Sequence, residues 1–212
     1  MIEAVYFDLD GTLTDPKPGI ARSIQYALRQ LGRAAPSEDE LTWCIGPPLR
    51  NSLVKLLGGE ALADDALTLY RGRFSETGLY ENSLYPGIAE VLHVLVARNI
   101  PLFVATSKPA IYAKRIVTHF GLDRHFHEIF GSELDGTRSD KTELLRYALA
   151  QTGTAPERTV MIGDRSHDMI GACNNAMRGF GVLYGYGSKA ELMEAGAERL
   201  FATPQSLEAL ID

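Results

Sequence analysis

The sequence predicts an α/β fold, a doubly wound parallel sheet covered by helices and interrupted by an all-helical insert. Six short apolar runs have the composition of strands, helical patterns separate most of them, and residues 16–83 contain no convincing strand. Strands that alternate with helices are typical of a parallel sheet with helices on both faces. The uninterrupted helical stretch is therefore expected to be inserted into that sheet.

The expected strands are the short apolar runs. They are Ala4–Phe7, Leu102–Ala105, Glu128–Phe130, Val160–Ile162, Gly181–Leu183 and Arg199–Phe201. The expected helices of the core are stripes of mostly apolar residues at helical spacing. These stripes are Ile88, Val91, Leu92, Leu95 and Val96; Ile111, Arg115, Ile116 and Phe120; Leu144, Leu145, Ala148 and Leu149; and Met169, Ala172, Cys173 and Ala176.

The segment from Pro16 to about Ser83 breaks the alternation of strands and helices. It has one helical stripe at Ile20, Ile24, Leu28 and Leu31, a break at Gly46–Pro48, and further helical material up to Phe74. Proline and glycine near residues 15–18 and 81–86 mark the linkers. We expect residues 1–15 and 84–212 to form a Rossmann-like core, and residues 16–83 to form a helical cap.

Composition excludes several classes of protein. The formal net charge is −6 and no basic block occurs, so a nucleic acid or a membrane surface is not an expected partner. No export signal and no apolar run of about 18 residues are present, which favours a cytoplasmic protein. Cys44 and Cys173 are expected to be reduced, buried thiols. Whether the chain is a monomer or a homodimer stays open.

Acidic and polar residues follow three of the expected strands. Asp8 and Asp10 follow the first strand, and residues i and i+2 of a strand point to the same face. Further along the chain come Thr106, Ser107 and Lys108, then Lys141, then Gly163, Asp164 and Asp168. Ligands of parallel sheets bind at the carboxyl ends of the strands. We therefore expect these groups to converge at one edge of the sheet.

The expected cluster has the groups that phosphoryl transfer needs. Asp8, Asp10 and Asp164 are hard oxygen ligands, too few to enclose calcium and suited to Mg²⁺ that keeps several waters. A carboxylate beside such an ion can attack phosphorus, and a second carboxylate can handle protons. Thr106 and Lys141 could hold phosphoryl oxygens. An acidic turn that only ends a strand is the alternative for the aspartate pair.

Four stretches together resemble the motifs of the haloacid dehalogenase superfamily. They are DLDGT at Asp8–Thr12, the strand that ends in Thr106 and Ser107, Lys141, and GDRSHD at Gly163–Asp168. The resemblance covers essentially the whole chain. The helical insert resembles that family's cap of the first type, and the stretches DPKPGI and YPG resemble its phosphoglycolate phosphatase branch.

The resemblance implies roles for the four aspartates. Asp8 would be the nucleophile and Asp10 the general acid and base. Asp8, the main-chain carbonyl of Asp10, and Asp164 would bind Mg²⁺, and Asp168 would bind the ion directly or support it. Relatives that cleave carbon–halogen bonds lack an acid at the position of Asp10, so phosphate esters are the expected substrates.

The resemblance also implies that Thr106 and Lys141 hold the phosphoryl group. Gly11 would let the main chain approach the phosphate closely, and Ser107 would bind substrate or cap the helix after Pro109. Arg50, in the stretch IGPPLR, could meet a substrate carboxylate. An exposed arginine at a corner between two helices is an equally good interpretation of it.

The expected activity is Mg²⁺-dependent hydrolysis of a small phosphorylated metabolite through a phosphoaspartate. The resemblance indicates 2-phosphoglycolate first, and a nucleoside monophosphate is the alternative. A phosphoacceptor receiver domain of a signalling system has a similar set of side chains on a doubly wound sheet. It has neither a large insert after the first strand nor the GDxxxD stretch, and this chain has both.

Overall fold

The computed structural model describes residues 2–210, and the chain divides into two compact units. One unit consists of Met1–Asp15 and Leu84–Asp212, and the other of Pro16–Ser83. Two short strands, β2 (Thr14–Asp15) and β3 (Ser83–Leu84), pair where the chain passes from one unit to the other. The cap is thus inserted between the first strand and the rest of the core.

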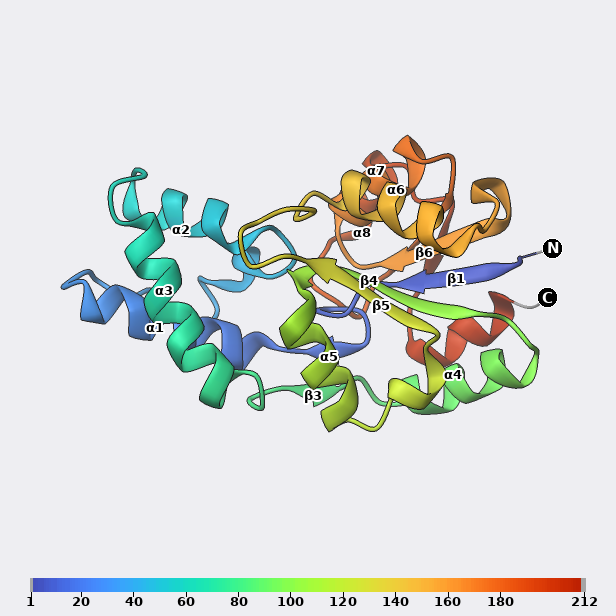
Figure 1. Cartoon of the computed structure of the whole chain (residues 1–212), viewed down its shortest axis with the longest axis horizontal. Coiled ribbons are helices and arrows are strands. Elements are labelled where there is room, and N and C mark those ends of the chain that lie inside the picture. Colours follow the sequence, from blue (N-terminus) through green and yellow to red (C-terminus); the bar gives the residue numbers. More distant parts are fainter. Residues whose placement is uncertain (1, 211–212) are drawn as a thin grey trace. The chain divides into compact units, whose positions relative to one another are not determined.

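The core unit contains a six-stranded sheet with the order β5-β4-β1-β6-β7-β8 (Figure 1). Its strands are β1 (Ala4–Phe7), β4 (Leu102–Pro109), β5 (Glu128–Ser132), β6 (Thr159–Gly163), β7 (Arg178–Val182) and β8 (Arg199–Phe201). All neighbouring strands are parallel. The predicted Rossmann-like α/β class is confirmed.

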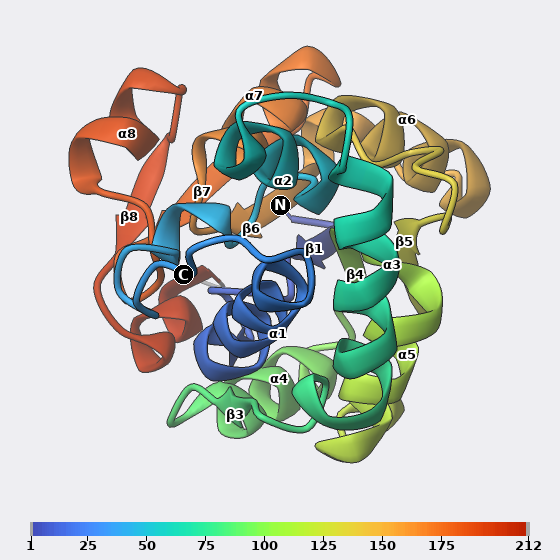
Figure 2. The same cartoon turned by 90° about the vertical axis from the view of Figure 1, so that its left-hand side faces the viewer.

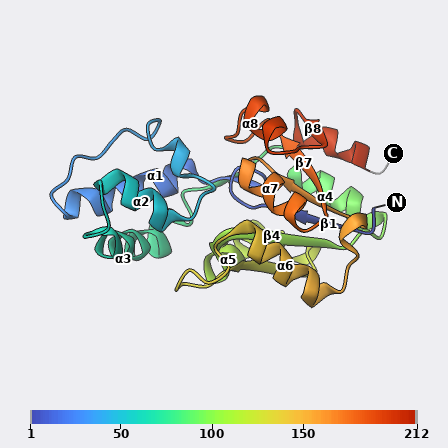
Figure 3. The same cartoon turned by 90° about the horizontal axis from the view of Figure 1, so that it is seen from above.

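Helices cover both faces of this sheet. They are α4 (Ile88–Ala97), α5 (Ala110–His119), α6 (Lys141–Thr152), α7 (Ser166–Asn174) and α8 (Lys189–Glu194), with short 3₁₀ turns at Asp123–His125, Pro156–Arg158 and Pro204–Leu210. Helices α6 and α7 lie over one face, and α4 and α5 over the other (Figures 1 and 3). Strand β1 lies between β4 and β6, with strands added outward on both sides, and ligands of such sheets bind outside the carboxyl ends of the strands at this point.

Buried aromatic and aliphatic side chains fix α6 against the sheet. Tyr6 of β1 stacks on Phe103 of β4 with ring centroids 4.8 Å apart, and both belong to a buried cluster with Met161, Leu145 and Ala148. Each fully buried large side chain of this kind stabilises the fold by about 1.5–3 kcal/mol. The packing holds the first residues of α6 close to the carboxyl ends of the strands.

Two predicted boundaries in the last third of the core are wrong. Strand β7 begins at Arg178, paired with Val160, and not at Gly181. The arginine and the two glycines of β7 gave no apolar signal, although they form regular strand. Ala176 does not continue the helical stripe, because α7 ends at Asn174 and Ala176 has a φ of 56°.

Strand β4 is longer than its apolar run. The run ends at Ala105, but β4 continues to Pro109 through polar residues, and its register with β5 shifts between Thr106 and Pro109. Such irregular pairing re-aims side chains at the end of a strand. Here it changes the direction of the residues that follow Thr106.

The cap unit contains only helices between its two linkers (Figure 2). They are α1 (Lys17–Gln30), a 3₁₀ turn at Thr42–Cys44, α2 (Leu49–Leu57), α3 (Ala63–Arg73) and a π-helical turn at Phe74–Gly78. Helix α1 packs along α3. Glu81 joins the two ends of the unit, because it pairs with Arg73 at 2.8 Å and with Arg22 at 3.2 Å. The predicted helical insert is confirmed.

Two further sequence predictions concern the cysteines and the membrane. Both thiols are free, but only Cys44 is buried; Cys173 is exposed, so its predicted burial is wrong. Cys173 lies on α7 outside the helix face that buries Met169 and Ala172. Within residues 2–210, every helix is too short or too polar to cross a bilayer.

Candidate active site

Three aspartates from the carboxyl ends of two neighbouring strands form a buried acidic cluster. Asp8 follows β1, Asp164 follows β6, and Asp168 lies in the first turn of α7. One carboxylate oxygen from each lies within 4.8 Å of the other two. The three residues are at most 4 % exposed. The pairing of β1 with β6 therefore brings together acids that are more than 150 positions apart in the sequence.

Lys141 contributes a positive charge to this cluster. It is the first residue of α6, and its Nζ lies 3.1 Å from Asp8 Oδ1 and 2.8 Å from Asp168 Oδ1. It also donates a hydrogen bond to the carbonyl of Ala105 at 2.8 Å. Burial by itself would lower the pKa of Lys141, but the two carboxylates outweigh it and raise the pKa. The lysine therefore stays charged, and one cation faces three acids.

Asp164 is fixed by contacts on several sides. Oδ2 accepts a hydrogen bond from the main-chain N–H of Tyr186 at 2.8 Å, and Oδ1 accepts one from the hydroxyl of Thr12 at 3.3 Å. Gly11 has a φ of 83°, and a Cβ there would lie 2.2 Å from Asp164 Oδ2. Burial and the charges of Asp168 and Asp8 raise the pKa of Asp164. With Lys141 as the nearby cation, ionising all three carboxylates together is therefore unfavourable.

Asp10 has its own partner, Lys108, which the sequence analysis placed at this edge of the sheet without assigning it a role. Lys108 Nζ lies 2.7 Å from Asp10 Oδ2, and both side chains are less than 10 % exposed. Burial raises the pKa of Asp10, while Lys108 partly opposes that increase. Lys108 lies in the irregular end of β4, directly after Thr106 and Ser107. Its position in that stretch was the only signal available in the sequence.

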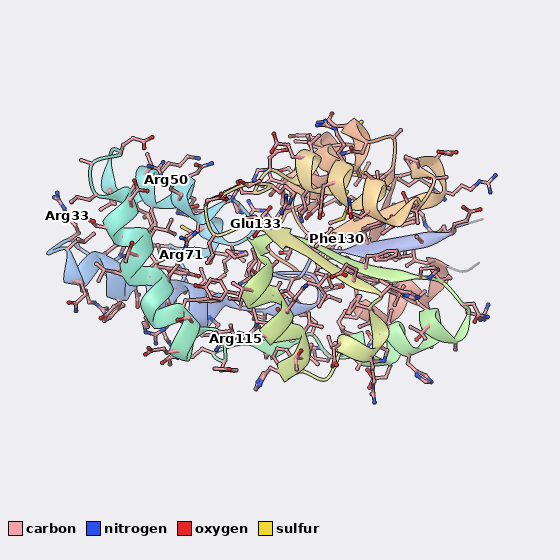
Figure 4. All side chains as sticks on the ribbon, viewed as in Figure 1. Arg33, Arg50, Arg71, Arg115, Phe130 and Glu133 are labelled. Carbon is pink, nitrogen blue, oxygen red and sulfur yellow. The ribbon has the colours of Figure 1, made fainter. Side chains whose placement is uncertain are left out.

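The remaining predicted residues are less closely tied to the acidic cluster. Thr106 is 2 % exposed, and its hydroxyl accepts a hydrogen bond from the N–H of Lys108 at 3.3 Å. The carbonyl of Ser107 accepts a hydrogen bond from the hydroxyl of Ser132. Arg50, labelled on the cap in Figure 4, pairs with Asp64 at 2.8 Å and Glu60 at 2.9 Å. Its guanidinium is therefore already engaged within the cap.

A groove of about 430 Å³ lies along the edge strand β5, away from the three aspartates. Phe130 and Glu133, labelled in Figure 4, line it together with Arg138 and Tyr147. The Arg138 guanidinium lies 4.4 Å from the centre of the Tyr147 ring and pairs with Glu133. The groove contains none of the predicted site residues.

Comparisons with known proteins show the family to which the chain belongs. The family model of haloacid dehalogenase-like hydrolases matches residues 5–182, which includes all four motif stretches. The chain therefore belongs to the haloacid dehalogenase-like hydrolase family. A predicted phosphatase from Clostridium acetobutylicum has a solved structure that matches with a TM-score of 0.96 and 39% identity, covering 100% of this chain and 98% of that chain.

Curated relatives have been given more than one function. A 5'-nucleotidase of Pseudomonas aeruginosa is 52% identical over 89% of this chain and 86% of its own length. The tyrosine-protein kinase PtkA of Mycobacterium tuberculosis is 43% identical over 87% of this chain, but this match spans only 63% of that longer protein. A phosphoglycolate phosphatase of Colwellia psychrerythraea is 30% identical over 95% of this chain and 93% of its own length. The family match and the two phosphatase relatives confirm the predicted enzyme class, a phosphoric monoester hydrolase.

Proposed function

We propose that this chain hydrolyses small phosphate monoesters with the help of Mg²⁺ and through a phosphoryl group carried on Asp8. The observation that carries this proposal is the cluster of Asp8, Asp164 and Asp168, whose carboxylate oxygens lie within 4.8 Å of one another. Buried carboxylates that are this close repel each other unless a cation lies among them. Lys141 supplies one positive charge to three carboxylates, so ionising all of them calls for a further cation.

The residues present fit a divalent cation. Carboxylate oxygens are the ligands that Mg²⁺ prefers, and a site with only a few of them leaves positions for water and a phosphate oxygen. Asp8, Asp164 and the main-chain carbonyl of Asp10 would hold the ion, and Asp168 would bind it or orient its neighbours. The ion would supply positive charge that stabilises the transferred phosphoryl group.

Asp8 would act as the nucleophile. Its carboxylate oxygen forms a bond to phosphorus while the bond from phosphorus to the ester oxygen breaks, and that oxygen takes a proton from Asp10. In the second step Asp10 takes a proton from water, the water oxygen attacks phosphorus, and the Asp8 carboxylate is released with inorganic phosphate. Splitting the hydrolysis in this way replaces one difficult step with two easier ones.

Asp10 needs to be protonated in the first step and ionised in the second. Its burial favours the neutral carboxyl, whereas Lys108 at 2.7 Å favours the carboxylate. A group that is alternately acid and base needs both influences, one favouring each form. Lys108 would also hold the side chain of Asp10 in one orientation.

Thr106 and Lys141 would bind the phosphoryl oxygens. The Lys141 ammonium already contacts Asp8, so a phosphoryl group on Asp8 would lie within its reach. Thr106 offers a hydroxyl at the end of the neighbouring strand β4. Ser107, Gly11 and Arg50 remain proposed substrate contacts.

Nucleoside 5'-monophosphates are the substrates to test first. The 52% identity with a 5'-nucleotidase supports this class more strongly than the 30% identity with a phosphoglycolate phosphatase supports 2-phosphoglycolate. This reverses the order that the sequence motifs alone favoured. 2-Phosphoglycolate stays the second candidate, because that relative matches over nearly the whole chain.

The test is the rate of phosphate release across a panel of nucleoside monophosphates, 2-phosphoglycolate and sugar phosphates, with Mg²⁺ and after chelation. We expect one class to be hydrolysed at least tenfold faster than the others, and chelation to abolish the activity. Asp8→Asn keeps the shape of the side chain and removes the nucleophile, so its rate should fall by at least about 10³-fold. Asp65→Asn, an exposed aspartate of α3, is the matched control. An Asp8→Asn variant as fast as the control would refute the proposal.

A further inference from the structure

The glycine-rich loop after β7, Tyr184–Gly187, contributes to none of the four motifs but contacts the acidic site. The main-chain N–H of Tyr186 donates to Asp164 Oδ2 at 2.8 Å. The hydroxyl of the same tyrosine donates to a carboxylate oxygen of Asp15. One residue therefore holds two acids: one in the buried cluster, and one at the last position of the first core segment.

The two glycines explain how the loop can lie so close to the site. A Cβ at Gly187 would lie 1.9 Å from the main-chain oxygen of Asp164, and a Cβ at Gly185 would lie 2.3 Å from the main-chain oxygen of Gly11. Main-chain atoms cannot move aside as the end of a side chain can. Glycine at both positions is therefore a requirement of this contact, although the run has no nucleotide-binding spacing.

Aromatic packing attaches the same loop to the returning linker. The ring of Tyr184 packs edge-on against Tyr85 at 5.0 Å between centroids, and its hydroxyl donates to the carbonyl of Thr12 at 3.1 Å. Tyr85 directly follows β3, and its N–H donates to the carbonyl of Leu13 at 3.2 Å. The loop therefore contacts the chain both just before the helical insert, at Thr12 and Asp15, and just after it, at Tyr85.

We propose that Tyr186 is a positioning residue that couples the orientation of Asp164 to the carboxylate of Asp15, the last residue before the helical insert. The coupling deepens the proposed function, because Asp164 is one of the acids proposed to hold the cation. A rotation of the main chain at Asp15 moves its carboxylate, and the Tyr186 hydroxyl bonded to that carboxylate moves with it. The N–H of Tyr186, which donates to Asp164, then points in a different direction. Cation binding and the conformation of the linker are thereby linked.

Tyr186→Phe tests this coupling, because it removes the hydroxyl and keeps the main-chain N–H. We expect Mg²⁺ to bind this variant at least threefold more weakly in calorimetric titration of the free protein, without substrate. A partner that orients a metal ligand typically contributes 10- to 100-fold in affinity, and Tyr186→Phe weakens this partner without removing it. Tyr147→Phe, an exposed tyrosine of α6, is the matched control and should bind Mg²⁺ as the parent does.

Asp15→Ala provides the second variant, because it removes the side-chain oxygen that accepts the same hydrogen bond. Its loss of Mg²⁺ affinity and that of Tyr186→Phe should not add in the double variant, because all three lack the same interaction. Independent, additive losses would overturn the coupling, as would Mg²⁺ affinity in Tyr186→Phe within twofold of the parent. If the parent binds no divalent cation, both the proposed function and this inference are wrong. If only the variants fail to differ from the parent, the inference alone is wrong.

Discussion

Replacing Gly11 with alanine tests the close approach of the first motif to Asp164. The new Cβ would lie 2.2 Å from Asp164 Oδ2, on a main chain with a φ of 83°. To restore an ordinary contact of 3.4 Å, the carboxylate has to move by about 1.2 Å. A displacement of about 1 Å in a catalytic group can cost about 10²-fold in rate, so we expect kcat to fall by about that factor.

The same substitution lowers stability by two effects. A non-glycine residue with positive φ costs about 1–2 kcal/mol, and overlap in a packed interior costs about 1–3 kcal/mol more. Gly153→Ala is the matched control, because Gly153 has a φ of 67° and no atom within 4 Å of an added Cβ. It should lose only the first contribution and keep its activity.

The assays are thermal unfolding followed by circular dichroism and steady-state hydrolysis of the best ester. Each kcal/mol lowers the melting temperature of a chain of this size by about 2–4 °C. Gly11→Ala should therefore melt several degrees below Gly153→Ala. Equal melting temperatures and equal rates in the two variants would refute the close approach of Gly11 to Asp164.

Three other predictions concern parts of the chain outside the acidic cluster. The hydrogen bond from Arg73 lowers the pKa of Glu81, so Glu81→Gln should destabilise the protein by about 1 kcal/mol near neutral pH. That difference in unfolding free energy should shrink as the pH falls below the ordinary glutamate value of about 4.3, because the carboxylate is then lost from the parent as well; a constant difference down to low pH would contradict this. Burial raises the pKa of Cys44 to about 11, so iodoacetamide should modify Cys173 alone in the native protein. Peptide mass spectrometry identifies the modified cysteine, and rapid labelling of Cys44 would contradict this prediction. Arg50→Met should change stability by at most about 1 kcal/mol, because ion pairs near the surface contribute little. If Arg50 meets a substrate carboxylate, the same substitution should raise KM for 2-phosphoglycolate more than for a nucleoside monophosphate. Equal changes in both KM values would exclude that contact.

The sequence predicts the fold well where burial dictates residue type. Strands β1, β4 and β6 are buried in the sheet, so their apolar runs are unmistakable, and acids directly after such runs must lie at the carboxyl edge. The polar end of β4 and the first residues of β7, Arg178 and Gly179, carry no apolar signal. Their pairing depends on neighbouring strands and not on their own composition.

The contacts of the site that the sequence analysis did not predict form between segments that are far apart in the sequence. Lys108 meets Asp10 from the end of β4, where the register with β5 shifts after Thr106. Tyr186 meets Asp164 because two glycines let a loop from the far half of the chain lie against it. Neither the spacing of these residues nor their type indicates such pairing, so a single sequence could not predict it.

The covalent role of Asp8 is tested most directly by locating the phosphoryl group during turnover. The protein is mixed with its best ester and Mg²⁺, quenched in acid within the first turnover, digested and analysed by mass spectrometry. The account predicts one added phosphoryl group on the peptide that contains Asp8, and none on that peptide in Asp8→Asn. Turnover with no phosphorylated aspartate, or with the group on a different residue, would contradict it.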